Sequence, residues 1–437
     1  MIKLYLYVCC FVLFSWSAYA QSPAVSERPN IIIMMADDLG YGDLACYGNA
    51  NIKTPNLDIL AQKGIKFLDF HTNGVVCSPT RASLLTGKYP QSTGVTGVIT
   101  AKDHRDVGLG KEEILISELL KKYDYRTGLV GKWHLGYDTT YSPVNQGFDV
   151  FKGFVSGNVD YHTHYDQENY FDWWLGKKPD QEKGYTTDLI TEHSLAFIEK
   201  HKKNPFFLYI AHEAPHAPYQ NRESKPTRTG DKSYQPQPLE DSLKVYHQMI
   251  EIMDEGVGRI LQALEDHQIA ENTLVLFLSD NGASKIGSNL PYRGQKSQVY
   301  EGGHRVPAMA YWKGVTKASE NNALLMTMDI YPTICDLIGE KLSPSTDLPG
   351  ISFKDILYGN TAKVKDRPVY WSFGRQAAVR EGNWKLVKIG QKYQLYNLKE
   401  DISEKNDLIL KNNERANHLK ATLEGWLAQM KTIPKKS

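Results

Sequence analysis

At Ile31-Ile32-Ile33-Met34-Met35-Ala36-Asp37-Asp38, an unbroken apolar run ends abruptly in two carboxylates. Such a run is typical of a strand buried on both faces of a parallel sheet. Runs of the same kind occupy residues 127–131, 206–211 and 274–278. Helical spacing of apolar residues over 188–200 and 250–264 separates them. The alternation predicts an α/β fold, with a large, mixed and mostly parallel sheet sandwiched by helices.

Every one of these runs is followed by side chains that can bind ions or transfer protons. In chain order they are Asp37, Asp38, Lys132, His134, His212, His216, Asp280 and Asn281. Open α/β sheets bind their ligands beyond the carboxyl ends of the strands. We therefore expect these side chains to converge on one site.

The acidic members of this group predict a metal site. Asp37, Asp38 and Asp280 repel one another unless a cation lies among them, and Asn281 adds an amide oxygen. Ligation by oxygen alone favours Ca²⁺, or Mg²⁺, over zinc. The alternative is that each aspartate caps a helix or turn.

A second motif, Cys77-Ser78-Pro79-Thr80-Arg81, predicts an anion site at the start of a helix. Ser78 suits an N-cap position, and Pro79 suits the first turn. Cys77 then lies where the helix dipole favours negative charge, with Arg81 one turn later on the same face. The alternative is a structural or metal-binding cysteine.

Basic residues complete the set of candidates. Lys132 and His134 share one face of an extended segment, and His216 stands in a rigid loop between two prolines. Lys296 follows Arg293-Gly294-Gln295. Taken singly, a histidine is more often structural and a lysine is more often solvated.

Together these segments, over roughly residues 28–426, resemble the type I (formylglycine-dependent) sulfatases of the alkaline-phosphatase-like superfamily. The resemblance implies that a maturation enzyme oxidises Cys77 to formylglycine, whose hydrate is the nucleophile. It implies that residue 77 joins Asp37, Asp38, Asp280 and Asn281 as ligands of one Ca²⁺ ion. It also implies a role for each remaining catalytic residue. Arg81 and Lys132 would hold the hydrate, and His134 would help to release sulfate. His216 and Lys296 would hold the sulfate and the leaving oxygen.

The expected function is hydrolysis of sulfate monoesters on sulfated saccharides, by exo action on glycan fragments and with release of inorganic sulfate. The Asp160-Tyr161-His162-Thr163-His164 segment resembles the substrate loop of glycan sulfatases, which implies substrate contacts for His162 and His164. His104 and Arg105 are further candidates. For each of these residues the alternative is a surface loop or local packing.

The N-terminus predicts export of the chain. Lys3 precedes an apolar run over residues 4–16, and Ala18-Tyr19-Ala20 is a cleavage signal, so residues 1–20 read as a signal peptide. This predicts a secreted or periplasmic protein without a stable membrane anchor; an uncleaved anchor is the alternative. Cleavage leaves Cys46 and Cys335 beside Cys77, and whether they pair is open.

The C-terminal part of the chain predicts a small subdomain. Turn-forming residues make 340–367 linker-like, and short strands are expected over 369–373, 376–380, 384–389 and 393–397. A helix over 414–430 completes an antiparallel sheet with one helix on it. We expect a catalytic domain over 21–340 and an α+β subdomain over 341–437.

Other functions remain open at this level. The net charge of +1, from 51 basic and 50 acidic residues, argues against nucleic acid as a partner. A phosphomonoesterase or phosphonate hydrolase of the same superfamily is the first alternative, but such enzymes use Thr or Ser and two zinc ions. A non-enzymatic binding protein on the same scaffold is the second.

Overall fold

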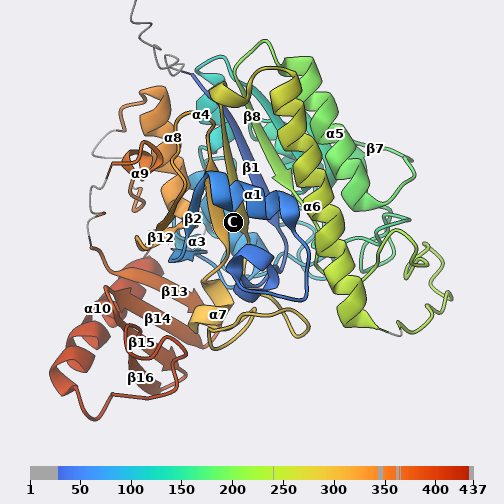
Figure 1. Ribbon diagram of the computed structural model, residues 1–437. Coiled ribbons are helices and arrows are strands. Elements are labelled where there is room, and N and C mark those ends of the chain that lie inside the picture. Colours follow the sequence, from blue (N-terminus) through green and yellow to red (C-terminus); the bar gives the residue numbers. More distant parts are fainter. Residues whose placement is uncertain (1–27, 240, 343–347, 361–363, 365, 433–437) are drawn as a thin grey trace, which may run out of the picture.

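The computed structural model describes residues 28–239, 241–342, 348–360, 364 and 366–432, so the predicted signal peptide lies outside the described residues. A ten-stranded sheet runs through the centre of the molecule (Figure 1). Its strands are β1 (Asn30–Ala36), β2 (Ile65–Phe67), β4 (Arg126–Lys132), β5 (Val150–Phe154), β6 (Trp174–Leu175), β7 (Lys178–Pro179), β8 (Phe206–Ala211), β9 (Thr273–Ser279), β10 (Ala308–Tyr311) and β11 (Ser319–Asn321). Their order is β11-β2-β10-β9-β1-β8-β4-β5-β6-β7.

The four predicted apolar runs form the parallel centre of this sheet. Strand β1 pairs in parallel with β8 on one side and with β9 on the other, so Ile31 lies between Phe207 and Leu274. Strand β4 continues the parallel arrangement beyond β8, whereas β10 pairs antiparallel to β9. The expected mixed, mostly parallel sheet is therefore confirmed.

Alternate residues of β1 enter two different cores. Ile31 and Ile33 pack with helices α2 (Cys77–Thr86), α4 (Ile116–Lys121) and α8 (Ile330–Ile338). Ile32 and Met34 pack on the opposite face with α1 (Pro55–Lys63), α5 (Thr186–His201) and α6 (Ser242–Asp266). Burial on both faces explains why the strand sequence has no polar alternation.

The linker-like stretch after residue 340 is partly a packed element, which corrects the prediction. It contains α9 (Lys354–Leu357), and Phe353, Ile356 and Leu357 are buried in the same core as α8. Turn-forming residues on both sides concealed this short apolar segment. The burial of three large side chains holds it against the large sheet.

A four-stranded antiparallel sheet follows, as expected. It consists of β13 (Val369–Phe373), β14 (Gln376–Glu381), β15 (Trp384–Ile389) and β16 (Lys392–Asn397), with α10 (Asn413–Thr432) packed on it (Figure 1). Figure 1 shows this unit beside α7 (Glu301–His304). The remaining α-helix is α3 (Pro90–Thr93), and the remaining strands are the short parallel pair of β3 (Phe70–His71) with β12 (Leu325–Met326).

Buried ion pairs join the small sheet to the large unit. The Arg380 guanidinium on β14 lies 2.6 Å from Asp69, and the Lys385 ammonium on β15 lies 2.9 Å from Glu301 of α7. Trp371 of β13 donates a hydrogen bond to the Thr72 carbonyl.

In the part of the chain that the structure describes, no helix combines the length and apolarity needed to cross a membrane.

Candidate active site

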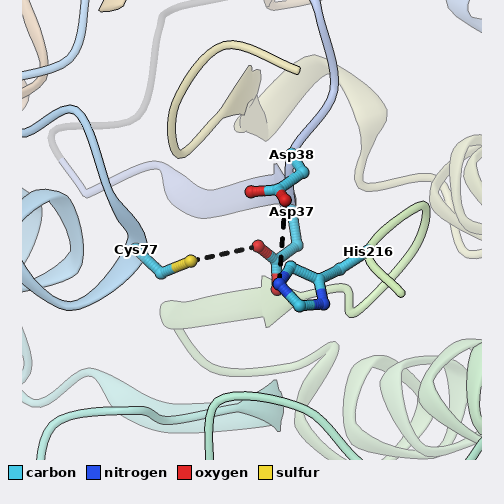
Figure 2. A group of neighbouring side chains, drawn as sticks. All are labelled: Asp37, Asp38, Cys77 and His216. Carbon is cyan, nitrogen blue, oxygen red and sulfur yellow. Dashed lines mark hydrogen bonds and ion pairs between the residues drawn. The ribbon is translucent and has the colours of Figure 1, made fainter. Parts of the chain in front are cut away.

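The candidate site lies beyond the carboxyl ends of the central strands, as predicted. Asp37 and Asp38 follow β1, His216 follows β8, and Cys77 begins α2. Figure 2 shows the four side chains pointing toward one another, and their potential ligand atoms all lie within 4.8 Å. The Cys77 sulfur is 3.4 Å from Asp37 Oδ1. Segments distant in the sequence thus form one buried cluster.

Cys77 is the first residue of α2, and Val76 rather than Ser78 occupies the N-cap position. The Ser78 hydroxyl instead accepts a hydrogen bond from the Ile99 N–H, so the predicted cap is wrong. The Ser78 side chain is drawn away because a loop from residue 99 packs over the start of the helix. Pro79 still lies in the first turn, and Arg81 follows one turn after Cys77.

The Cys77 thiol is held in its neutral form. Burial, followed by the negative charges of Asp280 and Asp37, raises the pKa of this thiol well above its ordinary value. The thiol, and not the more nucleophilic thiolate, is therefore the stable form at neutral pH. The unmodified side chain is a poor nucleophile in this setting.

Each of the three carboxylates is paired with a fixed cation. Lys132 lies 2.5 Å from Asp37, Lys296 lies 2.7 Å from Asp38, and the Arg81 Nη2 atom lies 2.8 Å from Asp280. Burial acts to raise the pKa of Asp37 and Asp38, but the neighbouring cations outweigh it, so both pKa values are lowered. Arg81 also donates to the Tyr209 hydroxyl. The arrangement offers three positive groups to an anionic substrate.

Asn281 supplies a buried acceptor. Its Nδ2 atom donates to Asp38 Oδ1 at 2.7 Å, whereas Oδ1 is buried without a hydrogen-bond partner among the described residues. An unpaired buried oxygen is costly unless a ligand satisfies it. Together with Asp37, Asp38 and Asp280 it forms an oxygen-rich donor set that fits a hard divalent cation. The sulfur of Cys77 is too soft to suit such an ion.

His134 has one ring nitrogen available as a base. Nε2 lies 2.9 Å from the Ile99 carbonyl, which can only accept, so Nε2 carries the hydrogen. Nδ1 is buried and has no hydrogen-bond partner among the described residues. Burial, then Lys132 and Arg81, lowers the pKa of His134 well below its ordinary value. The ring is therefore neutral, with a lone pair on Nδ1.

His216 faces the carboxylates through its other nitrogen. Nδ1 donates to the Ala217 carbonyl at 2.6 Å, and Nε2 lies 3.7 Å from Asp38 Oδ2. Burial and the charge of Lys296 lower the pKa of this histidine. Its side chain keeps 15% exposure, so it borders the opening of the site.

The four predicted substrate contacts are placed differently from one another. His104 bonds to Thr100, next to the carbonyl that anchors His134, and the neighbouring Arg105 side chain is 43% exposed. His162 is half-buried and bonds to the Asn221 carbonyl. His164 is buried and stacks on Trp173, which favours the local-packing alternative for this residue.

Two residues near the site were missed by sequence reasoning. Tyr209 lies inside β8, where its hydroxyl is hidden in an apolar pattern, and it contacts Arg81. Glu213 is buried with Oε1 accepting from the Val159 N–H, and burial raises its pKa well above the ordinary value. The signal available for Glu213 was its position directly after a buried strand.

Cys46 and Cys335 are both free thiols.

A family model for sulfatases matches residues 29–340 of the chain. The chain belongs to the sulfatase family. A second model, described as the C-terminal part of N-sulphoglucosamine sulphohydrolase, matches residues 294–432 of this sulfatase. The family assignment makes it a sulfuric ester hydrolase.

Individual sulfatases are also similar to this chain, in sequence and in structure. N-acetylgalactosamine-6-sulfatase of Homo sapiens is 33% identical over 80% of this chain and 69% of its own length. Arylsulfatase of Hemicentrotus pulcherrimus is 31% identical over 82% of this chain and 67% of its own length. The crystal structure of Ps i-CgsB in complex with k-i-k-neocarrahexaose superposes with a TM-score of 0.83 at 33% identity, covering 91% of this chain and 92% of that one.

Proposed function

We propose that this sulfatase hydrolyses sulfate monoesters of saccharides, using a formylglycine made from Cys77 and a Ca²⁺ ion. One observation carries the proposal: three carboxylates and three fixed cations surround a buried Cys77 at the start of a helix. An N-acetylgalactosamine-6-sulfatase among its relatives, and a solved relative bound to an oligosaccharide, support a saccharide substrate.

The proposed ion ligands are Asp37, Asp38, Asp280 and Asn281, together with the oxidised residue 77. When present, Ca²⁺ would supply positive charge beside residue 77 and formylglycine would supply an aldehyde hydrate as nucleophile. A formylglycine oxygen would replace the soft sulfur with a ligand that Ca²⁺ favours. Conversion requires a maturation enzyme as a partner during synthesis.

The protein's own cations bind and orient the sulfate group in this proposal. Arg81, Lys132 and Lys296 are held by ion pairs, so they need little reorganisation when negative charge develops on the sulfate oxygens. Arg81 and Lys132 also hold residue 77, and the Lys296 ammonium lies 3.4 Å from the Cys77 sulfur. Sulfuryl transfer depends mainly on such positioning and charge stabilisation, as phosphoryl transfer does.

Two histidines divide the proton transfers. His216 borders the opening, so its Nε2 is suited to deliver a proton to the departing sugar oxygen when the ring is in its cationic form, with a hydrogen on both nitrogens. His134 has a free lone pair on Nδ1, so it is suited to take a proton from residue 77 as sulfate leaves. The two roles need different protonation states, because His134 acts from the neutral ring and His216 from the cationic ring; in both, the ring nitrogen bonded to a backbone carbonyl keeps its hydrogen throughout.

For substrate contact, Arg105 is the best supported candidate. Its guanidinium stacks over the Tyr170 ring at 4.3 Å, and this ring is 56% exposed. An exposed aromatic beside a cation suits an anionic sugar. His104, His162 and His164 complete the proposed set of substrate contacts. The proposed mode of action is exo, at the ends of glycan fragments.

We further propose a catalytic domain over 21–340, a C-terminal subdomain over 341–437, and export through the signal peptide at 1–20. The export proposal rests on the cleavage signal at Ala18-Tyr19-Ala20. It predicts a secreted or periplasmic enzyme. The mass of the mature N-terminus would test it, because cleavage after Ala20 leaves Gln21 first.

The activity is tested by measuring sulfate released from a panel of sulfated mono- and disaccharides, with 4-nitrophenyl sulfate and a phosphate monoester alongside. We expect sulfate release from at least one saccharide and a peptide mass that shows formylglycine at position 77. Phosphate release without sulfate release would overturn the proposal in favour of a phosphomonoesterase. A converted residue 77 with release only from 4-nitrophenyl sulfate would overturn the saccharide substrate.

A further inference from the structure

Lys296 lies in a tight turn whose backbone is strained. The Gln298 N–H donates to the Gln295 carbonyl at 3.0 Å, so Lys296 and Ser297 are the two central residues of this turn. Ser297 has a φ of 71°, in the left-handed region that residues other than glycine adopt at an energetic cost. Such a conformation persists only where the surrounding structure holds it.

Both peptide groups of Ser297 are held by partners from distant segments. Its N–H donates to the Val75 carbonyl at 2.8 Å, two residues before Cys77. Its carbonyl accepts from Nε2 of Gln376 at 2.9 Å. The Oε1 atom of the same amide accepts from the Val299 N–H at 3.4 Å. One glutamine side chain therefore holds the segment that directly follows Lys296.

Gln376 is the first residue of β14, in the small C-terminal sheet. A side-chain amide offers a donor and an acceptor together, which is what a carbonyl and an N–H two residues apart require. Gln394 on β16 reaches the same segment differently, because its Oε1 accepts from the Tyr300 hydroxyl at 2.6 Å, beyond the turn. The two glutamines thus share a sheet but hold different parts of the segment.

The position of this turn determines where the Lys296 ammonium lies. Lys296 Nζ is 2.7 Å from Asp38 Oδ1 and 3.4 Å from the Cys77 sulfur. A lysine side chain is long and flexible, so its charge can be fixed only if the backbone that carries it is fixed. Displacement of a reacting group by about 1 Å can cost about 100-fold in rate.

We propose that Gln376 is a positioning residue for Lys296: the C-terminal sheet uses this amide to hold the Lys296 turn against the segment of residue 77. The proposal rests on the proposed role of Lys296 in the sulfate site. It gives the small sheet a part in catalysis that acts through Lys296, without any contact between Gln376 and the substrate.

The test is a double-mutant cycle on sulfate release from 4-nitrophenyl sulfate, with Gln376→Ala, Lys296→Ala and the combined variant. Gln376→Ala alone is expected to lower kcat/KM at least 10-fold with little change in Tm. In the Lys296→Ala background the same change is expected to cost less than 2-fold, because no ammonium remains to be positioned. If turnover without Lys296 is below detection, the affinity for inorganic sulfate, read by thermal shift, closes the same cycle.

Two matched variants complete the experiment. Gln376→Glu keeps the acceptor for Val299 but loses the donor to Ser297, so it is expected to lose activity as Gln376→Ala does. Gln394→Ala is expected to keep kcat/KM within about 2-fold. Equal losses for Gln376→Ala and Gln394→Ala, or a full loss from Gln376→Ala in the Lys296→Ala background, would overturn the positioning role. A wild-type enzyme that releases no sulfate after verified conversion of residue 77 would instead overturn the proposed function.

Discussion

Lys296 Nζ lies 3.4 Å from the Cys77 sulfur, although 219 positions separate the two residues in the sequence. The contact joins the start of α2 to a turn that the C-terminal sheet supports. Because Asp37, which Lys132 holds at the end of the central strands, contacts the same sulfur, residue 77 is enclosed on both sides. The chemistry at position 77 therefore depends on both units of the molecule.

Replacement of Cys77 by alanine should abolish turnover and leave the fold intact. Alanine cannot be oxidised to formylglycine, and a helix tolerates it well at this position. We expect no detectable sulfate release and an unchanged far-UV circular dichroism spectrum. Cys46→Ala, which alters a half-buried thiol outside the cluster, is the matched control and should keep full activity. Normal turnover by Cys77→Ala would contradict the proposed nucleophile.

Removal of divalent cations should inactivate the enzyme reversibly. Treatment with EGTA leaves Asp37, Asp38 and Asp280 without the charge that we propose among them, so sulfate release should stop and return with added Ca²⁺. Because the ion binds only the folded chain, Ca²⁺ should also raise Tm. Asp38→Asn should weaken this Tm response. Activity that survives exhaustive chelation would count against the metal site, and recovery with Mg²⁺ alone would change the assigned ion.

Loss of the buried Lys385 ammonium should destabilise the protein strongly. This group is fully buried and lies 2.9 Å from Glu301 and 3.0 Å from Glu404. Lys385→Met removes the cation that pairs with Glu404 and one of the three cations around Glu301, so we expect a loss of about 3–5 kcal/mol in the free energy of unfolding, measured in urea.

Lys388→Met is the matched control for that experiment. Lys388 lies on the same strand, and its partner Glu424 is 42% exposed, so solvent screens the pair. The expected loss is at most about 1 kcal/mol. Similar losses for both variants would show that the buried ion pairs of Lys385 contribute no more to the free energy of unfolding than an exposed ion pair does.

His164 should make the folded protein less stable in mild acid. Burial lowers the pKa of His164 from the ordinary 6.5 to about 4. The unfolded chain then takes up this proton at a higher pH than the folded chain, so the stability contribution is complete above pH 6.5 and is lost as the pH falls toward 4. At pH 5 the loss from this group amounts to about 2 kcal/mol.

Urea unfolding at pH 7.5 and pH 5 can isolate this effect. Asn tolerates the left-handed backbone of residue 164, where φ is 61°, so His164→Asn is the suitable variant. Wild type should lose about 2 kcal/mol more than His164→Asn between the two pH values. Parallel losses in the two proteins would refute the assignment of the acid sensitivity to His164.

Much of the fold could be predicted because its signals are local. The apolar runs that begin at Ile31, Thr127, Phe206 and Leu274 all became central strands, since a strand buried on both faces needs an unbroken apolar sequence. The C-terminal strands were predicted nearly to the residue. The α9 segment was missed because only three side chains hold it, and turn-forming residues surround them.

The central strands, the C-terminal strands, the family resemblance and the residues at the strand ends could all be predicted, because apolar patterns and short motifs carry that information locally. Three relationships became visible only in the tertiary structure. They are the pairing of each cation with its carboxylate, the hydrogen bond from Ile99 that keeps Ser78 from capping its helix, and the contact of Gln376 with the Lys296 turn. These relationships depend on distances of a few ångströms between segments that are far apart in the chain. No local pattern records such distances, since they arise only when the packed sheets and loops fix each side chain in place.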